Sequence, residues 1–123
     1  MAKHNTIGKE GEEIAASYLK SKGYQILEIN KQLGRAEVDI IAKIGLEYVF
    51  VEVKTRTSSY FGFPEESIGK SKINMLASAA EKYCIEQNME LDIRFDLISL
   101  VLEGSKQEII HVEDAFFPDQ ELF

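Results

Sequence analysis

The stretch AEVDIIAKIGLEYVFVEVKTR, residues 36 to 56, contains two segments rich in β-branched and other apolar residues on either side of Gly45. Such segments predict two strands, and the short connection at Gly45 predicts an antiparallel hairpin between them. Alternate residues of a strand share a face, so Glu52 and Lys54 lie on one side and the valines beside them point the other way into the core. This alternation explains how an acid and a base fit within an otherwise hydrophobic run.

The hairpin brings a second acid to the same level. Pairing around Gly45 puts Asp39 opposite Glu52 to within about one residue. Alternation further predicts that Val38 and Ile40 share the face opposite Asp39. Two carboxylates with a main-chain carbonyl can hold Mg²⁺ or Mn²⁺, and an ammonium such as that of Lys54 can stabilise a transition state. The grouping is typical of phosphodiester hydrolysis. The alternative is an ordinary solvated strand face with a surface ion pair.

The rest of the chain predicts five more elements. A buried stripe that begins at Ile7 indicates a helix ended by Gly23, and a second amphipathic helix covers residues 71 to 87. Turn-like residues fill 31 to 35, and a polar loop with Gly and Pro fills 57 to 71. Further strands are predicted at 24–30, 94–102 and 107–116. The order αβββαββ predicts a single α/β domain over residues 1–123, with a mixed central sheet flanked by helices.

Composition narrows the class of protein. The 123 residues contain one cysteine, Cys84, which excludes an internal disulfide. Apolar runs fall far short of the roughly 20 residues that span a bilayer, so we expect a cytoplasmic protein without a membrane partner. The net charge is −7, yet 11 of the 14 Lys and Arg lie in residues 1–72 beside 10 acids. The first half can therefore still form a face that contacts phosphates.

The acids and the lysine occur in a known pattern. Asp39 followed by Glu52-Val53-Lys54 resembles the signature of the PD-(D/E)XK nuclease superfamily, whose core order is αβββαβ. More closely, the chain resembles the YraN-like family of small uncharacterised bacterial proteins. The blocks that carry this resemblance are GKEGEEIAASYLKSKGYQILEIN, RAEVDIIA, VFVEVKTR, FGFPEESIGKSK and RFDLISL, between about residues 8 and 116.

The resemblance implies a restriction-endonuclease-like core and a nuclease site. It makes Asp39 and Glu52 the metal-binding carboxylates, Lys54 the catalytic lysine, and Glu12 a further acidic residue of the catalytic and metal-binding set. The implied cofactor is Mg²⁺ or Mn²⁺. The chain departs from the family at Ala36, where a glycine is usual, and Val38 replaces the superfamily's proline; neither change removes an acid or the lysine.

Five further charged positions are candidates for supporting roles. Arg56 continues the face of Glu52 and Lys54, and can contact a phosphate or pair with a carboxylate. Lys70 and Lys72 open the second helix, where a cation opposes the helix dipole, which favours a phosphate contact. Arg94 and Asp96 share a strand face and are predicted to form a structural pair.

Three functions remain open at this point. The first is a metal-dependent endonuclease acting on DNA, including branched or damaged DNA. The second is a non-catalytic nucleic-acid binding module of the same fold. The third is a protein-interaction subunit or homodimer, for which the acidic second half and the aromatic tail with Phe116, Phe117 and Phe123 would supply the surface.

Overall fold

The computed structural model describes residues 2–57, 70–87 and 92–115, which contain two helices and five strands in the predicted order. Their bounds are α1 Ala2–Ser21, β1 Gln25–Leu33, β2 Ala36–Ile44, β3 Glu47–Arg56, α2 Lys70–Glu86, β4 Asp92–Glu103 and β5 Lys106–Val112. Both predicted helices are confirmed to within a few residues at their C-terminal ends. The aromatic tail and most of the polar loop after β3 lie outside the described residues.

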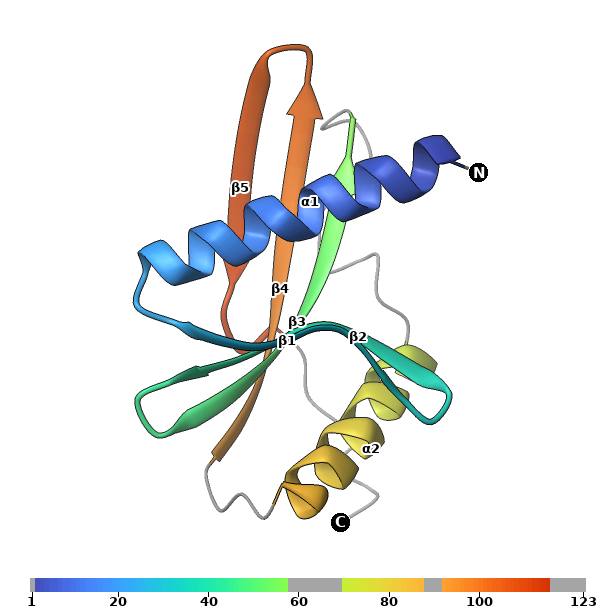
Figure 1. The fold of residues 1–123 in the computed structure, drawn as a ribbon, viewed down its shortest axis with the longest axis vertical. Coiled ribbons are helices and arrows are strands. Elements are labelled where there is room, and N and C mark those ends of the chain that lie inside the picture. Colours follow the sequence, from blue (N-terminus) through green and yellow to red (C-terminus); the bar gives the residue numbers. More distant parts are fainter. Residues whose placement is uncertain (1, 58–69, 88–91, 116–123) are drawn as a thin grey trace.

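The strands form one five-stranded mixed sheet in the order β1-β2-β3-β4-β5 (Figure 1). The pairs β1–β2, β2–β3 and β4–β5 are antiparallel, whereas β3 and β4 are parallel. Parallel neighbours need a long crossover connection, and the segment that contains α2 supplies it. This architecture is consistent with a restriction-endonuclease-like core and confirms the predicted mixed α/β fold.

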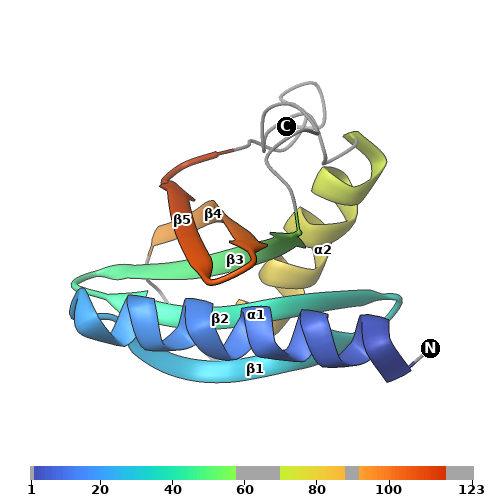
Figure 2. The ribbon, with the colours of Figure 1, turned by 90° about the horizontal axis from the view of Figure 1, so that it is seen from above.

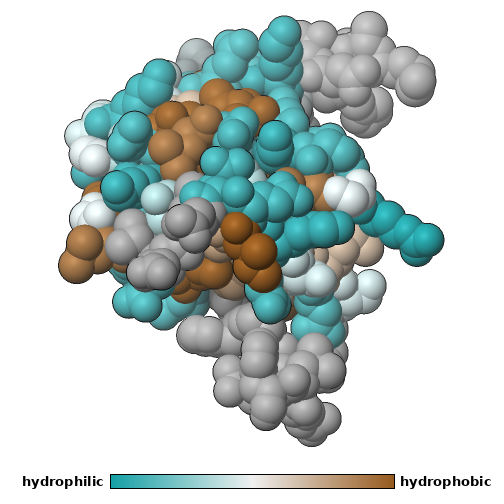
Figure 3. All heavy atoms as spheres, turned by 60° about the horizontal axis from the view of Figure 1, so that its bottom comes forward, coloured by the Kyte–Doolittle hydropathy of each residue, from teal (hydrophilic) through white to brown (hydrophobic). Residues whose placement is uncertain are grey.

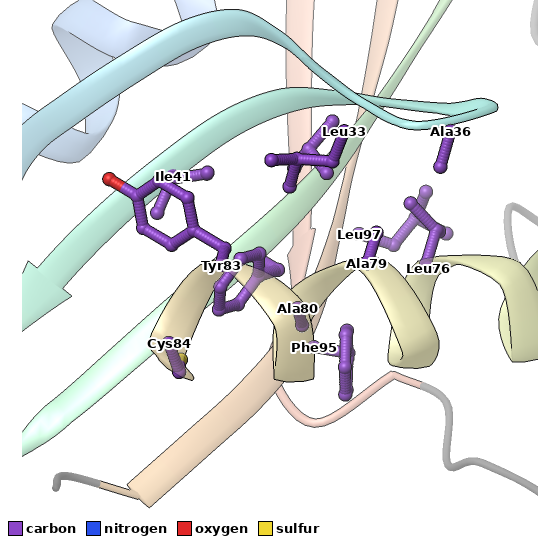
Figure 4. Packing of buried hydrophobic residues seen from close by; sticks show 12 residues of the cluster. Leu33, Ala36, Ile41, Leu76, Ala79, Ala80, Tyr83, Cys84, Phe95 and Leu97 are labelled. Atoms are coloured by element: carbon purple, nitrogen blue, oxygen red, sulfur yellow. The ribbon is translucent and has the colours of Figure 1, made fainter. Parts of the chain in front are cut away.

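The two helices cover different faces of the sheet (Figures 1 and 2). Small residues and Leu19 of α1 pack on Val49 and Val51 of β3. On the other face, the α2 residues Leu76, Ala79, Ala80 and Tyr83 pack with Phe50 and Leu97 and with the end of the β1–β2 hairpin (Figure 4). Both faces of β3 are therefore buried, so Glu52 does not lie on a solvated face.

The β2–β3 hairpin has the register that the sequence predicted. Its pairs run from Ile44–Glu47 to Ile40–Val51, and Gly45 occupies the turn with φ 56°. A positive φ strains residues that carry a Cβ, which is why a glycine fits this position. Continued by one step, the same register sets Asp39 beside Glu52.

Two local expectations are wrong. Residues 31–33 are not part of a turn, because β1 continues to Leu33 and only Gly34 and Arg35 connect it to β2. Val38 and Ile40 do not share a face: Val38 packs in the cluster under α2, and Ile40 in the cluster under α1. Pairing with β3 stops at Ile40, and the β1–β2 hairpin beyond it curls over α2, so simple alternation fails there (Figure 1).

Helix α1 approaches β3 closely at Gly11. A Cβ at this position would overlap the Thr55 hydroxyl and lie 3.1 Å from the Thr55 Cβ. The next residue of the helix is Glu12, so this close approach brings a helical acid to the β3 strand that carries Glu52. Gly11 therefore helps to position a candidate site residue as well as pack the core.

Gly11→Ala is expected to destabilise the protein by about 1–3 kcal/mol, because the added methyl must displace Thr55 or the helix. Gly8→Ala is the matched control, since nothing lies within 4 Å of a Cβ at Gly8. That change is expected to stabilise the helix by up to about 1 kcal/mol. Urea unfolding of both variants measures the difference. Equal effects of the two changes would contradict the close approach.

The surface of the described residues carries large hydrophobic side chains singly or in small groups. Figure 3 shows such side chains separated by hydrophilic ones over much of one face. The exposed ones are Ile29, Leu46, Met75, Ile85, Ile93 and Ile110. Isolated apolar residues of this kind are normal on soluble domains and do not define a docking surface. Neither α1 nor α2 is long and apolar enough to cross a membrane.

Candidate active site

Asp39 and Glu52 meet at the point where β2 and β3 stop pairing. Asp39 is half-buried and its Oδ2 accepts a hydrogen bond of 2.8 Å from the backbone amide of Val53. Its carboxyl group is also in hydrogen-bond contact with that of Glu52, whose side chain is only 5% exposed. The amide that would otherwise continue the strand ladder therefore fixes the Asp39 side chain next to Glu52.

The closeness of these acids changes the protonation of Asp39. Burial, and then the negative charge of Glu52, raise the pKa of Asp39 to about 8, although the hydrogen bond from Val53 acts in the opposite direction. The charge of Glu12 contributes a smaller rise, which places this α1 residue near the pair. Two carboxyl groups in contact cannot both ionise easily, so Asp39 keeps its proton at neutral pH.

Lys72, at the start of α2, neutralises Glu52. Its Nζ lies 3.0 Å from Glu52 Oε1 and 2.9 Å from Oε2, so it contacts both oxygens of the carboxylate. The lysine side chain is 44% exposed, in contrast to its buried partner. The sequence predicted a phosphate contact for Lys72 and gave no sign of this ion pair, because 20 residues separate the two positions.

Two other predicted site residues lie on β3 together with Glu52. Lys54 follows Glu52 by two positions on β3 and is half-buried, so its side chain lies on the face of Glu52. Arg56 is half-buried at the end of the same strand. Lys70 begins α2, but its side chain is outside the described part. The predicted phosphate contacts of Arg56, Lys70 and Lys72 stay predictions.

A shallow groove adjoins the Glu52–Lys72 pair. It has a volume of about 290 Å³ and lies between the β1–β2 turn and the first turns of α2. Its lining includes Arg35, Glu37, Ser71 and Lys72. Two cations, Arg35 and Lys72, thus line this groove, and Lys72 also contacts Glu52.

The donor chemistry of the pair suits a small divalent cation. In the described ranges, no group of three or more His, Cys, Asp or Glu side chains is arranged to hold a metal, so Glu12 remains a predicted ligand. Mg²⁺ needs fewer protein ligands, since it is commonly held by one or two carboxylates and keeps several waters. Asp39 and Glu52 supply those hard oxygen donors and fit this ion.

Asp39→Asn is expected to remove a pH-dependent loss of stability. The raised pKa means that folded protein keeps a proton which the unfolded chain releases, so wild-type stability falls as pH rises from about 4 to about 8. Asparagine retains an oxygen that accepts from Val53 and does not titrate. The melting temperature of Asp39→Asn minus that of wild type is the quantity to compare. In EDTA, this difference should therefore be about 5 °C larger at pH 9 than at pH 4.

Glu37→Gln is the matched control for this experiment, because it removes an exposed acid two residues earlier on β2. Its difference in melting temperature from wild type should change little between the two pH values. If Asp39→Asn behaves like Glu37→Gln, the Asp39–Glu52 contact does not exist in solution.

A second polar cluster lies under the C-terminal half of α1, and its full extent was missed by sequence reasoning. The predicted pair of Arg94 and Asp96 is confirmed, with Arg94 Nη2 donating to Asp96 Oδ2 at 2.8 Å. Asp96 is fully buried and also accepts from His111 Nε2 at 2.7 Å and from the Asp114 amide at 3.0 Å. The Tyr18 hydroxyl lies 3.2 Å from the other ring nitrogen of His111.

Hydrogen bonds control the charge of Asp96. Burial acts to raise the pKa of Asp96, but bonds from His111, Arg94 and the Asp114 amide together outweigh it and hold that pKa below its ordinary value. Asp96 therefore stays ionised at neutral pH. The cluster links β4 and β5 to α1, and its satisfied bonds indicate a structural role.

The family model and the similar proteins agree on one family. The model of "Uncharacterised protein family UPF0102" matches residues 11–100. A UPF0102 protein of Christiangramia forsetii is 43% identical over 117 residues, covering 95% of this chain and 98% of the relative. UPF0102 protein FP2501 of Flavobacterium psychrophilum is 44% identical over 117 residues, with the same coverage.

Among solved structures, the chain is similar to Pyrococcus furiosus SfsA in complex with Ca²⁺, with a TM-score of 0.38 and 16% identity. The match covers 89% of this chain and 63% of that one. A likeness this weak carries no argument about the site. Since the family model spans most of the sequence and the relatives match 95% of it, the chain belongs to the uncharacterised protein family UPF0102.

Proposed function

We propose that this protein is a metal-dependent nuclease that hydrolyses phosphodiester bonds in DNA. The observation that carries the proposal is the contact between the Asp39 and Glu52 carboxyl groups, held in place by the Val53 amide. Placing two acids together in a largely buried position costs stability, and such arrangements concentrate at functional sites. Lys54, two residues after Glu52, completes the set of groups that phosphodiester hydrolysis needs.

Each side chain has a distinct part in the proposed reaction. Asp39 and Glu52 would hold Mg²⁺ or Mn²⁺, with Glu12 as a further acid close to Asp39. When bound, the ion would polarise a phosphoryl oxygen and lower the pKa of a bound water. Lys54 would place its ammonium beside the nucleophile and stabilise the negative charge that develops on the phosphate.

The proposed substrate is a nucleic acid, bound by the basic side chains around the acidic pair. Arg35 and Lys72 line the groove between the β1–β2 turn and α2, and Arg56 ends the strand that carries Lys54. The chain has 21 acids against 14 Lys and Arg, a net charge of −7, which opposes the binding of a polyanion. We therefore expect weak binding, because only a few phosphates are neutralised. The affinity should decrease as the salt concentration rises.

The test is a cleavage assay on labelled single-stranded, double-stranded and branched DNA and on RNA, with Mg²⁺, Mn²⁺ or EDTA. Wild-type protein should cleave at least one DNA substrate with a metal and none with EDTA. Glu52→Gln, purified in parallel, detects contaminating nucleases and should be inactive. Absence of metal-dependent cleavage across the panel would contradict the proposal, and binding without cleavage would identify the non-catalytic module instead.

A further inference from the structure

The Glu52 carboxylate has a lysine where a metal ion would have to bind. Lys72 Nζ lies 3.0 and 2.9 Å from its two oxygens, so the ammonium bridges them. A cation held jointly by Asp39 and Glu52 must take at least one of those same oxygens. The ion pair and the proposed metal site therefore overlap in space.

The Lys72 ammonium and a divalent ion cannot both bind Glu52 without weakening each other. A divalent ion on either oxygen would lie within a few ångströms of the ammonium, and like charges at that separation repel strongly in a partly buried site. Glu52 is fixed, with 5% of its side chain exposed, and cannot rotate away into water. Lys72 can move, because 44% of its side chain is exposed and its stem is flexible.

We propose that Lys72 is a displaceable counterion of Glu52, which neutralises the carboxylate in the metal-free protein and leaves it when a divalent cation binds. The inference rests on the proposed metal site. The released ammonium stays beside the groove that Arg35, Ser71 and Lys72 line, where a substrate phosphate on the metal would meet it. Lys72 would thus become a substrate contact, because metal binding would free its charge from Glu52 for the phosphate.

The exchange also links metal binding to helix α2. In the metal-free protein the Lys72–Glu52 pair ties the first turn of α2 to β3, because the two residues come from these elements. Metal binding removes this tie. The proposal therefore predicts competition that can be measured by metal binding alone, without any substrate or cleavage.

Binding of Mn²⁺ is measured from the electron paramagnetic resonance signal of the free ion, at neutral pH and without nucleic acid. Lys72→Met, which keeps the apolar stem and removes the charge, should bind Mn²⁺ about fivefold more tightly than wild type, the factor expected from losing a half-exposed competing ion pair. Lys72→Arg keeps a cation and should bind Mn²⁺ no more tightly than wild type.

Lys82→Met is the matched control, because it removes the same charge from an exposed position on the same helix. It should leave Mn²⁺ affinity within about twofold of wild type, which separates local competition from the change in net charge. Circular dichroism and melting temperature confirm that each variant is folded. Tighter binding by Lys72→Met alone supports the proposal.

Two results would overturn it, and they can be told apart. If wild type and Lys72→Met bind Mn²⁺ with equal affinity, and Asp39→Asn weakens that binding, the metal site exists but Lys72 does not compete for it. If neither wild type nor Lys72→Met binds Mn²⁺, the metal site itself fails, and the proposed function fails with it.

Discussion

Lys54→Met is expected to lower the rate of DNA cleavage by at least about 100-fold, because removing one preorganised charge from a developing oxyanion typically has this effect. Lys54 is half-buried on β3 and methionine preserves most of its side-chain volume. The fold should therefore change little, and the variant should still bind Mn²⁺. Single-turnover cleavage with saturating Mg²⁺ or Mn²⁺ measures the effect on the chemical step.

Lys82→Met serves again as the control in this assay. Lys82 lies on the exposed surface of α2, so the variant should cleave at the wild-type rate. A Lys54→Met protein that folds, binds Mn²⁺ and cleaves as fast as wild type would show that Lys54 has no part in the reaction. Loss of cleavage together with loss of Mn²⁺ binding would assign Lys54 to the metal site instead.

Asp96→Ala is expected to destabilise the protein by about 3–5 kcal/mol, because it leaves the Arg94 guanidinium largely buried without its main partner. Asp96 is fully buried, whereas the Arg94 side chain is 12% exposed. The substitution also removes the acceptor for His111 and for the Asp114 amide. Urea unfolding at pH 7 measures the loss.

Glu47→Ala is the matched control, since it removes another acid that pairs with Arg94. The Glu47 carboxylate lies 3.1 Å from the guanidinium, and its side chain is 40% exposed. A loss of no more than about 1 kcal/mol is expected there. The pKa of Asp96 lies below the ordinary 3.8, so ionised Asp96 stabilises the fold above that pH and the contribution disappears as pH falls. Equal losses for the two variants at pH 7 would refute the buried cluster.

The parts of the fold that depend on neighbouring residues were predictable. Gly45 and the β-branched segments around it gave the hairpin, and the hairpin gave the register that sets Asp39 beside Glu52. Alternation also gave the direction of Glu52 and Lys54. It failed at Val38 and Ile40, because where a strand leaves its neighbour and curls is decided by packing of the whole hairpin on α2.

Contacts between distant segments could not be predicted. The helix dipole suggested a phosphate partner for Lys72, but Glu52 becomes its partner only through the crossover that returns α2 to the sheet. His111 has no metal-ligand spacing with another histidine, and its contact with Asp96 depends on β5 pairing with β4. Sequence periodicity gives the face on which such a side chain lies, and the tertiary fold supplies its partner.

The proposed metal site of Asp39 and Glu52 is tested directly by X-ray diffraction at the manganese absorption edge from crystals grown with saturating Mn²⁺. An anomalous peak is expected about 2.1 Å from a carboxylate oxygen of each residue, the separation typical of small hard cations. Crystals in which both carboxylates are ordered and no anomalous peak lies between them would contradict it.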